Sequence, residues 1–391
     1  MLEKIISKTK GDRWIWLIVI FLSIWSLLAV YSATGTLAYK QGVGSEQFLI
    51  KHTVMIIGGL ALMYFSHLLD YRHYAGISKV LMIVTIPLLL YTLFFGSNIN
   101  SASRWVTIPI INQTFQTSDM AKLALITFLA RTLSRKQENI KDAKKAFLPI
   151  MGSVCGIFIL IAPANLSTGM MLFGVSILLL IIGRISIKQI ALVCLGGIFI
   201  LFGMIMLGKG RSSTWTSRVD VFLHPEKASA DKSFQANQSK IAIATGGIFG
   251  KGPGNSTQRN FLPHPYSDFV FALIIEEYGL IGGLVLVFLY LLFLYRCILI
   301  VTQSPKAFGA LLAAGLSFSL TIQAFANMAV AVGLGPVTGV PLPLVSMGGT
   351  SILFTSIAFG IILSVSRDND EKQAETVKGK EKVYVGEIPA M

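Results

Sequence analysis

The sequence predicts an all-α polytopic membrane protein with about ten transmembrane helices. Its composition supports this fold class, because 53% of the 391 residues are hydrophobic and only 13% are charged. Soluble domains carry about 25% charged residues. In addition, apolar runs of about 18 or more residues recur along the chain, and each is long enough to cross a hydrocarbon core about 30 Å thick.

The expected spans follow the apolar runs in chain order. They lie at roughly 14–34, 49–69, 77–96, 119–133, 147–163, 166–183, 189–207, 268–299, 307–332 and 348–366. The first run follows several basic residues, as in a signal peptide, but it is too long for one and further spans follow it. We therefore expect a retained first helix, one ten-span domain over 1–366, and a flexible cytoplasmic tail over 367–391.

Lysine and arginine residues predict how the spans are oriented. They gather at the N-terminus, in 70–78, 134–146, 184–188 and 296–306, and in the tail, whereas the alternate short connections hold few of them. Short loops rich in positive charge stay on the cytoplasmic side. Both termini are therefore expected in the cytoplasm. We interpret the net charge of +14 as this bias together with attraction to anionic lipid, not as nucleic-acid binding.

One connection, 208–267, is much longer than the others and is expected on the outer face, between the seventh and eighth spans. It carries eight lysines and arginines and the glycine-rich stretch IAIATGGIFGKGPGNS. A loop this long without regular structure is usually functional or disordered. Because backbone N–H groups and basic side chains bind phosphate, this loop is a candidate for holding one.

Common catalytic motifs are absent from the sequence. It contains no GxxxxGK[ST], GxSxG, HExxH or paired CxxC, so nucleotide hydrolysis, serine hydrolysis and zinc chemistry have no support. The three cysteines and five histidines show no metal-ligand spacing. We interpret the cysteines as small buried hydrophobic residues.

Acidic residues at membrane depth are the main candidates for chemistry, because ionisable groups inside spans are costly and usually face a cavity. Asp268 opens an apolar run that also contains Glu276 and Glu277. On a helix with about 100° per residue, Glu276 is the better candidate to share a cavity with Asp268, and Glu277 points away. Two interpretations of Asp268 stay open at this point: a helix cap, or a proton acceptor in catalysis.

Asp119 and Lys122 form a second candidate pair. They lie three residues apart on an expected helix and so share a face. They are either a structural ion pair or part of a cavity lining.

The stretch GLGPVTGVPLPLVSMGGTS (333–351) is too rich in proline and glycine to form a regular helix. Irregular backbone beside a membrane is tolerated only against protein or water. We therefore expect a re-entrant or cavity-lining loop, with a helix beginning at about Gly348.

Five stretches together resemble the signatures of one protein family. In order they are SASRWVTIPIINQTFQTSDMAKLALI, ANLSTGMM, IAIATGGIFGKGPGNS, FLPHPYSDFVFALIIEEYG and GLGPVTGVPLPLVSMGGTS. They are similar to the motifs of the SEDS family (shape, elongation, division and sporulation), in the family's order and along nearly the whole chain. The resemblance implies a ten-span cell-wall polymerase of the bacterial cytoplasmic (inner) membrane.

The resemblance also implies an activity, a substrate and partners. The activity is that of a peptidoglycan glycosyltransferase, which polymerises lipid II into glycan strands on the outer face. Asp268, in the SDF step, matches the family's essential aspartate, whose implied role is general base or proton relay for the acceptor hydroxyl. The implied partners are a class B penicillin-binding protein transpeptidase, other membrane proteins of the division machinery, and membrane lipid. No cofactor is firmly implied; the one to consider is a divalent cation, Mg²⁺ or Mn²⁺.

A further set of residues is expected to bind the substrate. Most of them match polar or glycine positions of the family's motifs, whereas Lys251 is proposed from its charge, as a ligand for pyrophosphate. The set comprises Arg104, Asp119, Lys122, Arg218, Gln238, Lys251, Gly254, Ser256, Glu276, Thr338 and Ser346.

The chain departs from the family pattern at two of these motifs. Asn165 stands where the family often has aspartate, which puts any role of this position in doubt, and Tyr266 replaces a common histidine. Thr338 favours the elongation branch of the family, whereas SLLAVYSATGTLAYK and NMAVAVG favour the division branch. We expect the division branch and a place at the septum, with an elongation-type polymerase as the alternative.

Two further alternatives belong to other functional classes. A lipid II flippase would need charge distributed through the membrane depth, whereas this sequence concentrates acidic and basic residues near the outer face. A non-enzymatic scaffold of the division machinery would need only surfaces for its partners.

Overall fold

The computed structural model describes residues 10–386 except for 36–41, 43, 100–101, 109–112, 141, 207–211, 225, 227–229 and 263–264. Each of the ten expected spans corresponds to a helix. These helices are α2 (Arg13–Ala33), α4 (Ser45–Leu68), α5 (Tyr71–Phe95), α6 (Thr117–Arg135), α7 (Leu148–Ile161), α8 (Leu166–Ile182), α9 (Ile187–Met206), α12 (Val270–Gln303), α13 (Ala307–Ala331) and α14 (Thr350–Gly386).

The remaining elements are short. They are three strands, β1 (Ser97–Ile99), β2 (Ala102–Ile108) and β3 (Gln113–Gln116), two further helices, α10 (Ser212–Leu223) and α11 (Ala230–Gly246), and the turns η1 (Gln137–Asn139), η2 (Ala143–Phe147) and η3 (Gln258–Asn260).

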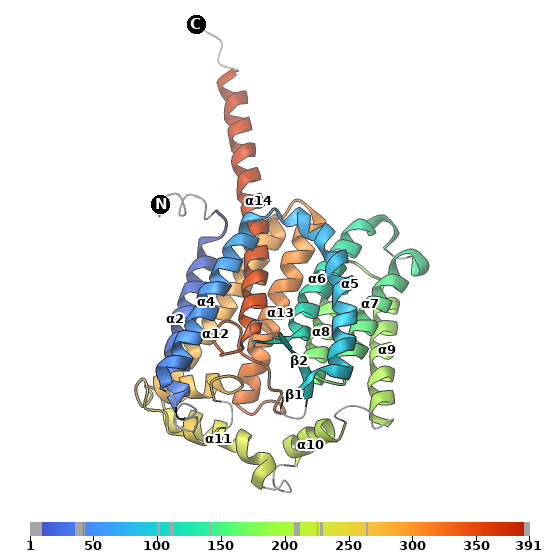
Figure 1. Ribbon diagram of the computed structural model, residues 1–391. Coiled ribbons are helices and arrows are strands. Elements are labelled where there is room, and N and C mark those ends of the chain that lie inside the picture. The colour runs from blue at the N-terminus through green and yellow to red at the C-terminus, as the bar shows by residue number, and fades with distance from the viewer. Residues whose placement is uncertain are drawn as a thin grey trace.

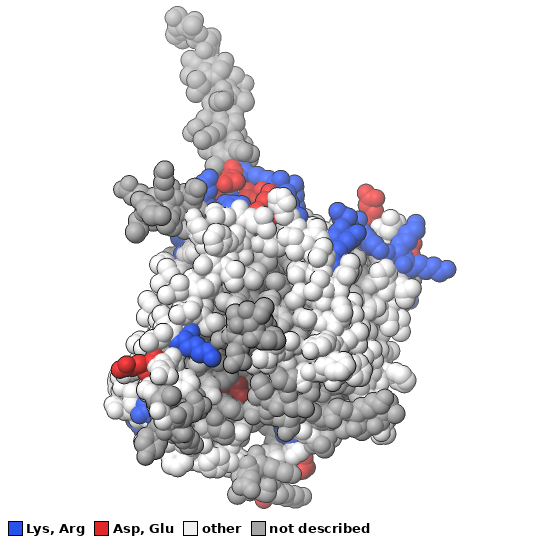
Figure 2. Space-filling model, viewed as in Figure 1, with Lys and Arg blue, Asp and Glu red and all other residues white. Residues whose placement is uncertain are grey.

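The surface of the helical bundle is suited to lipid. In the described part of the chain, eight helices are long and apolar enough to cross a membrane, and α8 is a shorter apolar helix. Large side chains such as Phe94 and Phe199 are 73% and 76% exposed, which is unfavourable in water but not against acyl chains. Figure 2 shows a broad belt of uncharged side chains around the middle of the molecule. The predicted fold class is therefore confirmed.

The two ends of the bundle differ. Figure 1 shows α2 beginning and α14 ending at one end of the molecule, which we call the terminal face. Helices α10 and α11 lie at the opposite end, which we call the loop face. Lysine and arginine residues gather at the terminal face (Figure 2).

Helix α13 lies inside the bundle and positions much of the site. It packs against α6, α8, α12 and α14, and its apolar residues, such as Leu312 and Ala324, are fully buried. Helices α4 and α14 approach each other closely, because a Cβ atom at Gly360 would lie 2.4 Å from the carbonyl oxygen of Met63. A glycine is required where two backbones come this close.

Three features differ from the sequence expectations. The connection 208–267 is not one structureless loop, since it contains α10 and α11. Ser239 and Ala242 of α11 are completely buried, and this tertiary packing stabilises the helix. The stretch before α6 forms an antiparallel sheet in the order β1-β2-β3, with Trp105 opposite Gln116. Finally, α14 continues past the predicted boundary at 366 as far as Gly386.

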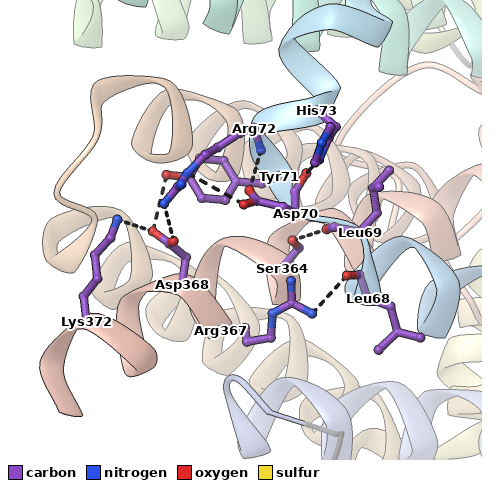
Figure 3. Close-up of polar contacts among 10 residues, drawn as sticks. All are labelled: Leu68, Leu69, Asp70, Tyr71, Arg72, His73, Ser364, Arg367, Asp368 and Lys372. Atoms are coloured by element: carbon purple, nitrogen blue, oxygen red, sulfur yellow. Dashed lines mark hydrogen bonds and ion pairs between the residues drawn. The ribbon is translucent and has the colours of Figure 1, made fainter. Parts of the chain in front are cut away.

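An ion cluster at the terminal face ties the beginning of this extension to the bundle (Figure 3). Arg72 Nη2 lies 2.8 Å from Asp368 Oδ1, and Lys372 contacts the other oxygen of the same carboxylate. One turn earlier, Ser364 Oγ donates to the carbonyl of Leu69 at 2.5 Å. The turn between α4 and α5 is thereby attached to α14.

Candidate functional site

Asp268 lies at the loop face, in the turn 265–269 that precedes α12. The N-cap residue of α12 is Phe269, which makes no side-chain cap. In the described part of the chain, the half-buried Asp268 carboxylate accepts a hydrogen bond from Ser267 Oγ, 2.9 Å from Oδ1, and none from a helical N–H. The helix-cap interpretation of Asp268 is therefore wrong.

Neighbouring elements fix the turn that carries Asp268. Ser346 Oγ donates to the carbonyl of Ser267 at 2.6 Å, and the N–H of Met347 donates to the carbonyl of Tyr266 at 2.9 Å. Asn327 Nδ2, from α13, donates to the carbonyl of Asp268 at 2.9 Å. Burial raises the pKa of the Tyr266 hydroxyl, and the charge of Asp268 raises it further, so this phenol stays neutral beside the carboxylate.

The stretch 333–349 forms the wall opposite this turn. It is irregular from the end of α13 to Thr350, where α14 begins, which confirms the expectation of a non-helical loop. Its apolar side chains are buried, Val345 completely. Gly339 has φ +67°, and a Cβ atom there would lie 3.3 Å from Asp268 Oδ2. The absence of a side chain at Gly339 keeps this oxygen of the carboxylate uncovered.

The predicted pair Asp119 and Lys122 is a buried ion pair on α6. Their atoms Oδ1 and Nζ lie 2.9 Å apart, and Asp119 is 3% exposed. Lys122 Nζ also donates to Gln323 Oε1 at 2.8 Å, and Gln323 Nε2 donates to the carbonyl of Pro341 at 2.9 Å. The pair is therefore connected to the wall beside Asp268. The other oxygen of Asp119, Oδ2, has no hydrogen-bond partner among the described residues.

A cavity of about 570 Å³ opens at the loop face between α10, α11 and the end of α13. We call it the loop-face cavity. Arg218, on α10, lies in its wall and donates from Nη1 to the carbonyl of Val337 at 2.9 Å. The residues that line the loop-face cavity are Thr214, Ser217, Arg218, Val221, Phe222, Ser233, Gln235, Ala236, Asn237, Lys240, Val330, Gly333, Gly335, Pro336 and Val337.

A smaller cavity of about 90 Å³ adjoins it on the other side of Arg218, and Asn165 and Thr338 line it. Asn165 is also the N-cap of α8, because its Oδ1 accepts from the N–H of Thr168 at 3.3 Å. Asparagine and aspartate cap helices about equally well. The departure from the family's aspartate therefore preserves the cap and removes a charge beside Arg218.

The glycine-rich stretch is inserted into a break in α12, an arrangement we call the glycine junction (246–252 against 275–281). Helix α12 is interrupted at Gly279, with φ 72° and ψ −173°. The N–H groups of Lys251 and Gly252 donate to the carbonyls of Glu276 and Glu277, each at 2.9 Å, and the N–H of Leu280 donates to the carbonyl of Gly247 at 2.9 Å. The break in the helix is thus compensated by hydrogen bonds to the inserted stretch.

Glu276 is completely buried at this junction. Its Oε1 lies 2.6 Å from Lys251 Nζ and accepts from Thr257 Oγ1 at 2.8 Å. Its Oε2 accepts from Ser256 Oγ and from the N–H of Gln258. The expectation that Glu276 shares a cavity with Asp268 is wrong, because α12 begins after Asp268 and the helical-wheel relation does not apply. Lys251 and Ser256 are used to hold Glu276, so we do not place them in the substrate site.

Glu277 connects the junction to another helix. Ser32 Oγ, at the end of α2, donates to Glu277 Oε1, and Arg259 Nη1 donates to the carbonyl of Ser32 at 2.9 Å. Glu277 is 3% exposed. The two adjacent glutamates therefore bind the stretch 251–259 from two sides.

Three of the predicted residues remain. Gln238 is half-buried on α11. Gly254 has φ +79°, and its N–H donates to the carboxylate of Glu277. Arg104 lies on β2, but its side chain is outside the described residues. Across the described parts of the chain, no three His, Cys, Asp or Glu side chains gather into a metal-binding group. Because Mg²⁺ is often held by one or two carboxylates and substrate phosphates, the divalent cation stays a prediction.

Sequence reasoning did not select three residues that the structure brings to the site: Gln323, Asn327 and Lys240. The signal for the first two was present. They are two amides four residues apart in a span without charged residues, and such polar groups usually face a partner inside the bundle. Lys240 differs from Lys251, the lysine that the sequence selected, by its packing.

The fold and this site define a class: a polytopic α-helical membrane protein with a carboxylate and a polar cavity on one membrane face. A family model described as cell cycle protein, covering FtsW, RodA and SpoVE, matches residues 12–371. The chain belongs to this family, which confirms the resemblance to SEDS proteins.

Individual relatives and solved structures agree with this assignment. Stage V sporulation protein E of Bacillus subtilis is 34% identical over 367 residues, covering 92% of this chain and 98% of that protein. A probable peptidoglycan glycosyltransferase FtsW of Haemophilus influenzae is 33% identical over 362 residues, covering 90% and 89%. A chain of a peptidoglycan synthase complex has a TM-score of 0.70 at 24% identity. The rod shape determining protein RodA of Thermus thermophilus has a TM-score of 0.66 at 22% identity, and each structure covers 92% of this chain and 98% of its own. At these identities the two structures support the fold alone.

Proposed function

We propose that the chain is a peptidoglycan glycosyltransferase that polymerises lipid II on the outer face of the cytoplasmic membrane. Relatives at about a third identity over most of the chain are named probable peptidoglycan glycosyltransferase. The observation that carries the proposal is the position of Asp268. Its carboxylate lies at the loop face, is oriented by Ser267, and keeps Oδ2 uncovered beside Gly339.

In the proposed reaction, Asp268 is the general base. The acceptor sugar hydroxyl gives its proton to the Asp268 carboxylate while its oxygen forms a bond to the anomeric carbon of the donor. The bond from that carbon to the lipid pyrophosphate breaks, and its electron pair leaves with the pyrophosphate. A positioned general base contributes roughly 10²- to 10⁴-fold to such a step.

The surroundings of Asp268 suit this role. Ser346 and Asn327 fix the backbone of its turn, so the carboxylate need not be ordered when substrate binds. The buried pair Asp119–Lys122 supports the opposite wall through Gln323. We assign these residues to positioning rather than to contact with the reacting atoms.

The proposed orientation places both termini in the cytoplasm, because the basic terminal face obeys the positive-inside rule. The proposed partner is a class B penicillin-binding protein, since one structural neighbour belongs to a peptidoglycan synthase complex for polymerization and crosslinking. We favour a role in division at the septum over one in elongation, because the stretches SLLAVYSATGTLAYK and NMAVAVG resemble the division branch.

The test is glycan polymerisation by purified protein supplied with lipid II, alone and with a co-expressed class B penicillin-binding protein. We expect polymer from the wild type and at least a roughly 100-fold lower rate from Asp268→Asn. The matched control is Asp220→Asn, which removes an exposed carboxylate from α10 and should polymerise normally.

Two outcomes would contradict the proposal. If Asp268→Asn made full-length glycan at the wild-type rate, the catalytic assignment would be wrong. If the wild type made no polymer while the complex with its partner formed normally, a scaffold would replace the enzyme. Movement of lipid II from one leaflet of a proteoliposome membrane to the other, without polymerisation, would instead indicate a flippase.

A further inference from the structure

We propose that the loop-face cavity binds the diphosphate-linked sugar of a lipid substrate, with Lys240 and Arg218 contacting the diphosphate. This inference rests on the proposed function, because it assigns that substrate's anionic group to a place in the fold. The sequence suggested Lys251 as the ligand for the anion. The structure leads us to assign this role to Lys240, a lysine of α11.

The size and lining of the cavity suit such a ligand. Its volume of about 570 Å³ is within the range of small-molecule sites, roughly 300–1,000 Å³. Hydroxyl and amide side chains form much of its wall, including Ser217, Ser233 and Asn237, and these groups can hydrogen-bond sugar hydroxyls. Among the described lining residues there are two cations and no aspartate or glutamate. The charge of the wall therefore favours an anion.

The packing of α11 directs Lys240 to this place. One residue earlier, Ser239 Oγ donates to the carbonyl of Ala331 at 2.7 Å, which fixes α11 against the end of α13. Lys240 then lies across Gly333, where a Cβ atom would be 2.5 Å from Lys240 Cε. Gly333 has φ +82°, so both its backbone conformation and its missing side chain suit this arrangement. The Lys240 side chain stays exposed and can present its ammonium group to a ligand.

Arg218 occupies the boundary between the loop-face cavity and its smaller neighbour, since it lines both. Its Nη1 donates to the carbonyl of Val337, which orients the guanidinium plane. A guanidinium has five N–H donors and can contact phosphate oxygens in pairs. One arginine can therefore be attached to the wall and still contact a ligand.

The cavity is also close enough to Asp268 for the reaction. Val337 lines the cavity, and a Cβ atom at Gly339, two residues later, would lie 3.3 Å from Asp268 Oδ2. Two residues of extended chain span at most about 7 Å. In addition, Val330 in the cavity wall packs in one apolar cluster with Phe269, the neighbour of Asp268. A diphosphate bound in the cavity would thus leave from a sugar carbon near the base.

The test measures binding separately from catalysis. Full-length Asp268→Asn protein in lipid nanodiscs is titrated with radiolabelled undecaprenyl diphosphate, undecaprenyl monophosphate or inorganic pyrophosphate. We expect the lipid diphosphate to bind, and Lys240→Gln to weaken it about tenfold, as the loss of one charge-assisted hydrogen bond predicts. Lys240→Arg should bind almost normally. Lys51→Gln, which removes an exposed lysine of α4 outside the cavity, should have no effect.

The outcomes separate this inference from the proposed function. Unchanged binding of undecaprenyl diphosphate by a normally folded Lys240→Gln protein would overturn the assignment, even if the wild type polymerises lipid II. Inorganic pyrophosphate binding as tightly as the lipid form would replace the lipid-linked ligand by a free anion. If binding depends on Lys240 but the wild-type protein makes no polymer, the cavity assignment stays intact and the proposed function is refuted.

Discussion

Two polar regions of the loop face, the glycine junction and the loop-face cavity, use their charged side chains in opposite ways. At the junction, Lys251 and Glu276 lie 2.6 Å apart, and the glutamate is completely buried. In the cavity, Lys240 is exposed, and the described residues around it include no acid. Both lysines belong to the same long connection, within a dozen positions of each other.

The difference shows which charges are available to a substrate. A buried carboxylate is costly unless it is paired and hydrogen-bonded, so Glu276 requires Lys251, Ser256 and Thr257 around it. These groups stabilise the fold and have little capacity left for a ligand. Lys240 lines a polar cavity whose described lining contains no carboxylate, so no acid in that lining neutralises its charge. The junction is thus a structural connection between α11 and α12, whereas the cavity is the surface that we propose binds substrate.

The largest expected effect comes from breaking the buried pair of the junction. Glu276→Ala removes the carboxylate partner of Lys251 and the acceptor of two N–H groups, those of Thr257 and Gln258. Removing one partner of a buried ion pair typically costs about 3–5 kcal/mol. We expect a strong loss of folded protein, measured as the temperature at which the detergent-solubilised protein loses its monodisperse fraction.

Two further variants sharpen this result. Glu226→Ala, at a glutamate whose side chain is 65% exposed, should leave that temperature unchanged. The double variant Lys251→Met/Glu276→Gln should be less destabilised than the sum of its single changes, because each single change leaves an uncompensated group. Normal stability of Glu276→Ala would contradict a structural role and return Glu276 to the candidates for substrate binding.

A smaller effect is expected from two glycines of the same stretch. A Cβ atom at Gly250 would lie 2.2 Å from the carbonyl oxygen of Glu277, whereas a Cβ atom at Gly254 would have nothing within 4 Å. Both have positive φ, +82° and +79°. Gly250→Ala therefore adds a backbone clash to the conformational strain, about 2–4 kcal/mol in total, and Gly254→Ala adds only strain, about 1 kcal/mol.

The comparison is made by the same thermal assay, together with the polymerisation rate. We expect Gly250→Ala to lose folded protein and Gly254→Ala to remain folded. Equal stability of the two variants would mean that the glycine-rich stretch is not inserted into α12. A folded Gly254→Ala protein without activity would instead support the sequence-based prediction that Gly254 contacts substrate.

The fold could be predicted from the sequence because its main determinant is local. Each span is an apolar run long enough for the membrane, and most helix boundaries agree within a few residues, for example 307–332 expected and Ala307–Ala331 observed. The end of α14 is the exception, at Gly386 instead of 366. The short sheet and the two helices of the long connection were not predicted. Their pairing and packing depend on residues distant in sequence, such as Ser239 against Ala331.

The site could be predicted only where one residue type in one motif carries the signal. Asp268 was selected because an acid at the edge of an apolar run is unusual; the structure places it in the turn before α12, and its catalytic role stays a prediction. Glu276 and Lys251 were not interpreted correctly, because they are each other's partners, and because α12 begins after Asp268, so that the helical-wheel relation between Asp268 and Glu276 does not apply. Charge alone did not distinguish Lys251 from Lys240, whose difference lies entirely in packing.

The smallest effect is expected from an ion pair of the terminal face whose cation is partly exposed to solvent. Arg72, whose side chain is 46% exposed, pairs with Asp368 (Figure 3). Because such pairs are screened by water and salt, Arg72→Ala should change the stability by less than about 1 kcal/mol, and the change should shrink at high salt. Thermal unfolding at low and high salt, with Arg72→Lys as the control that keeps the charge, checks this. A loss of stability as large as that of Glu276→Ala would contradict this prediction. The exposed Arg72 would then stabilise the attachment of α14 as strongly as the buried Glu276 stabilises the glycine junction, and burial would not explain which charges stabilise the fold.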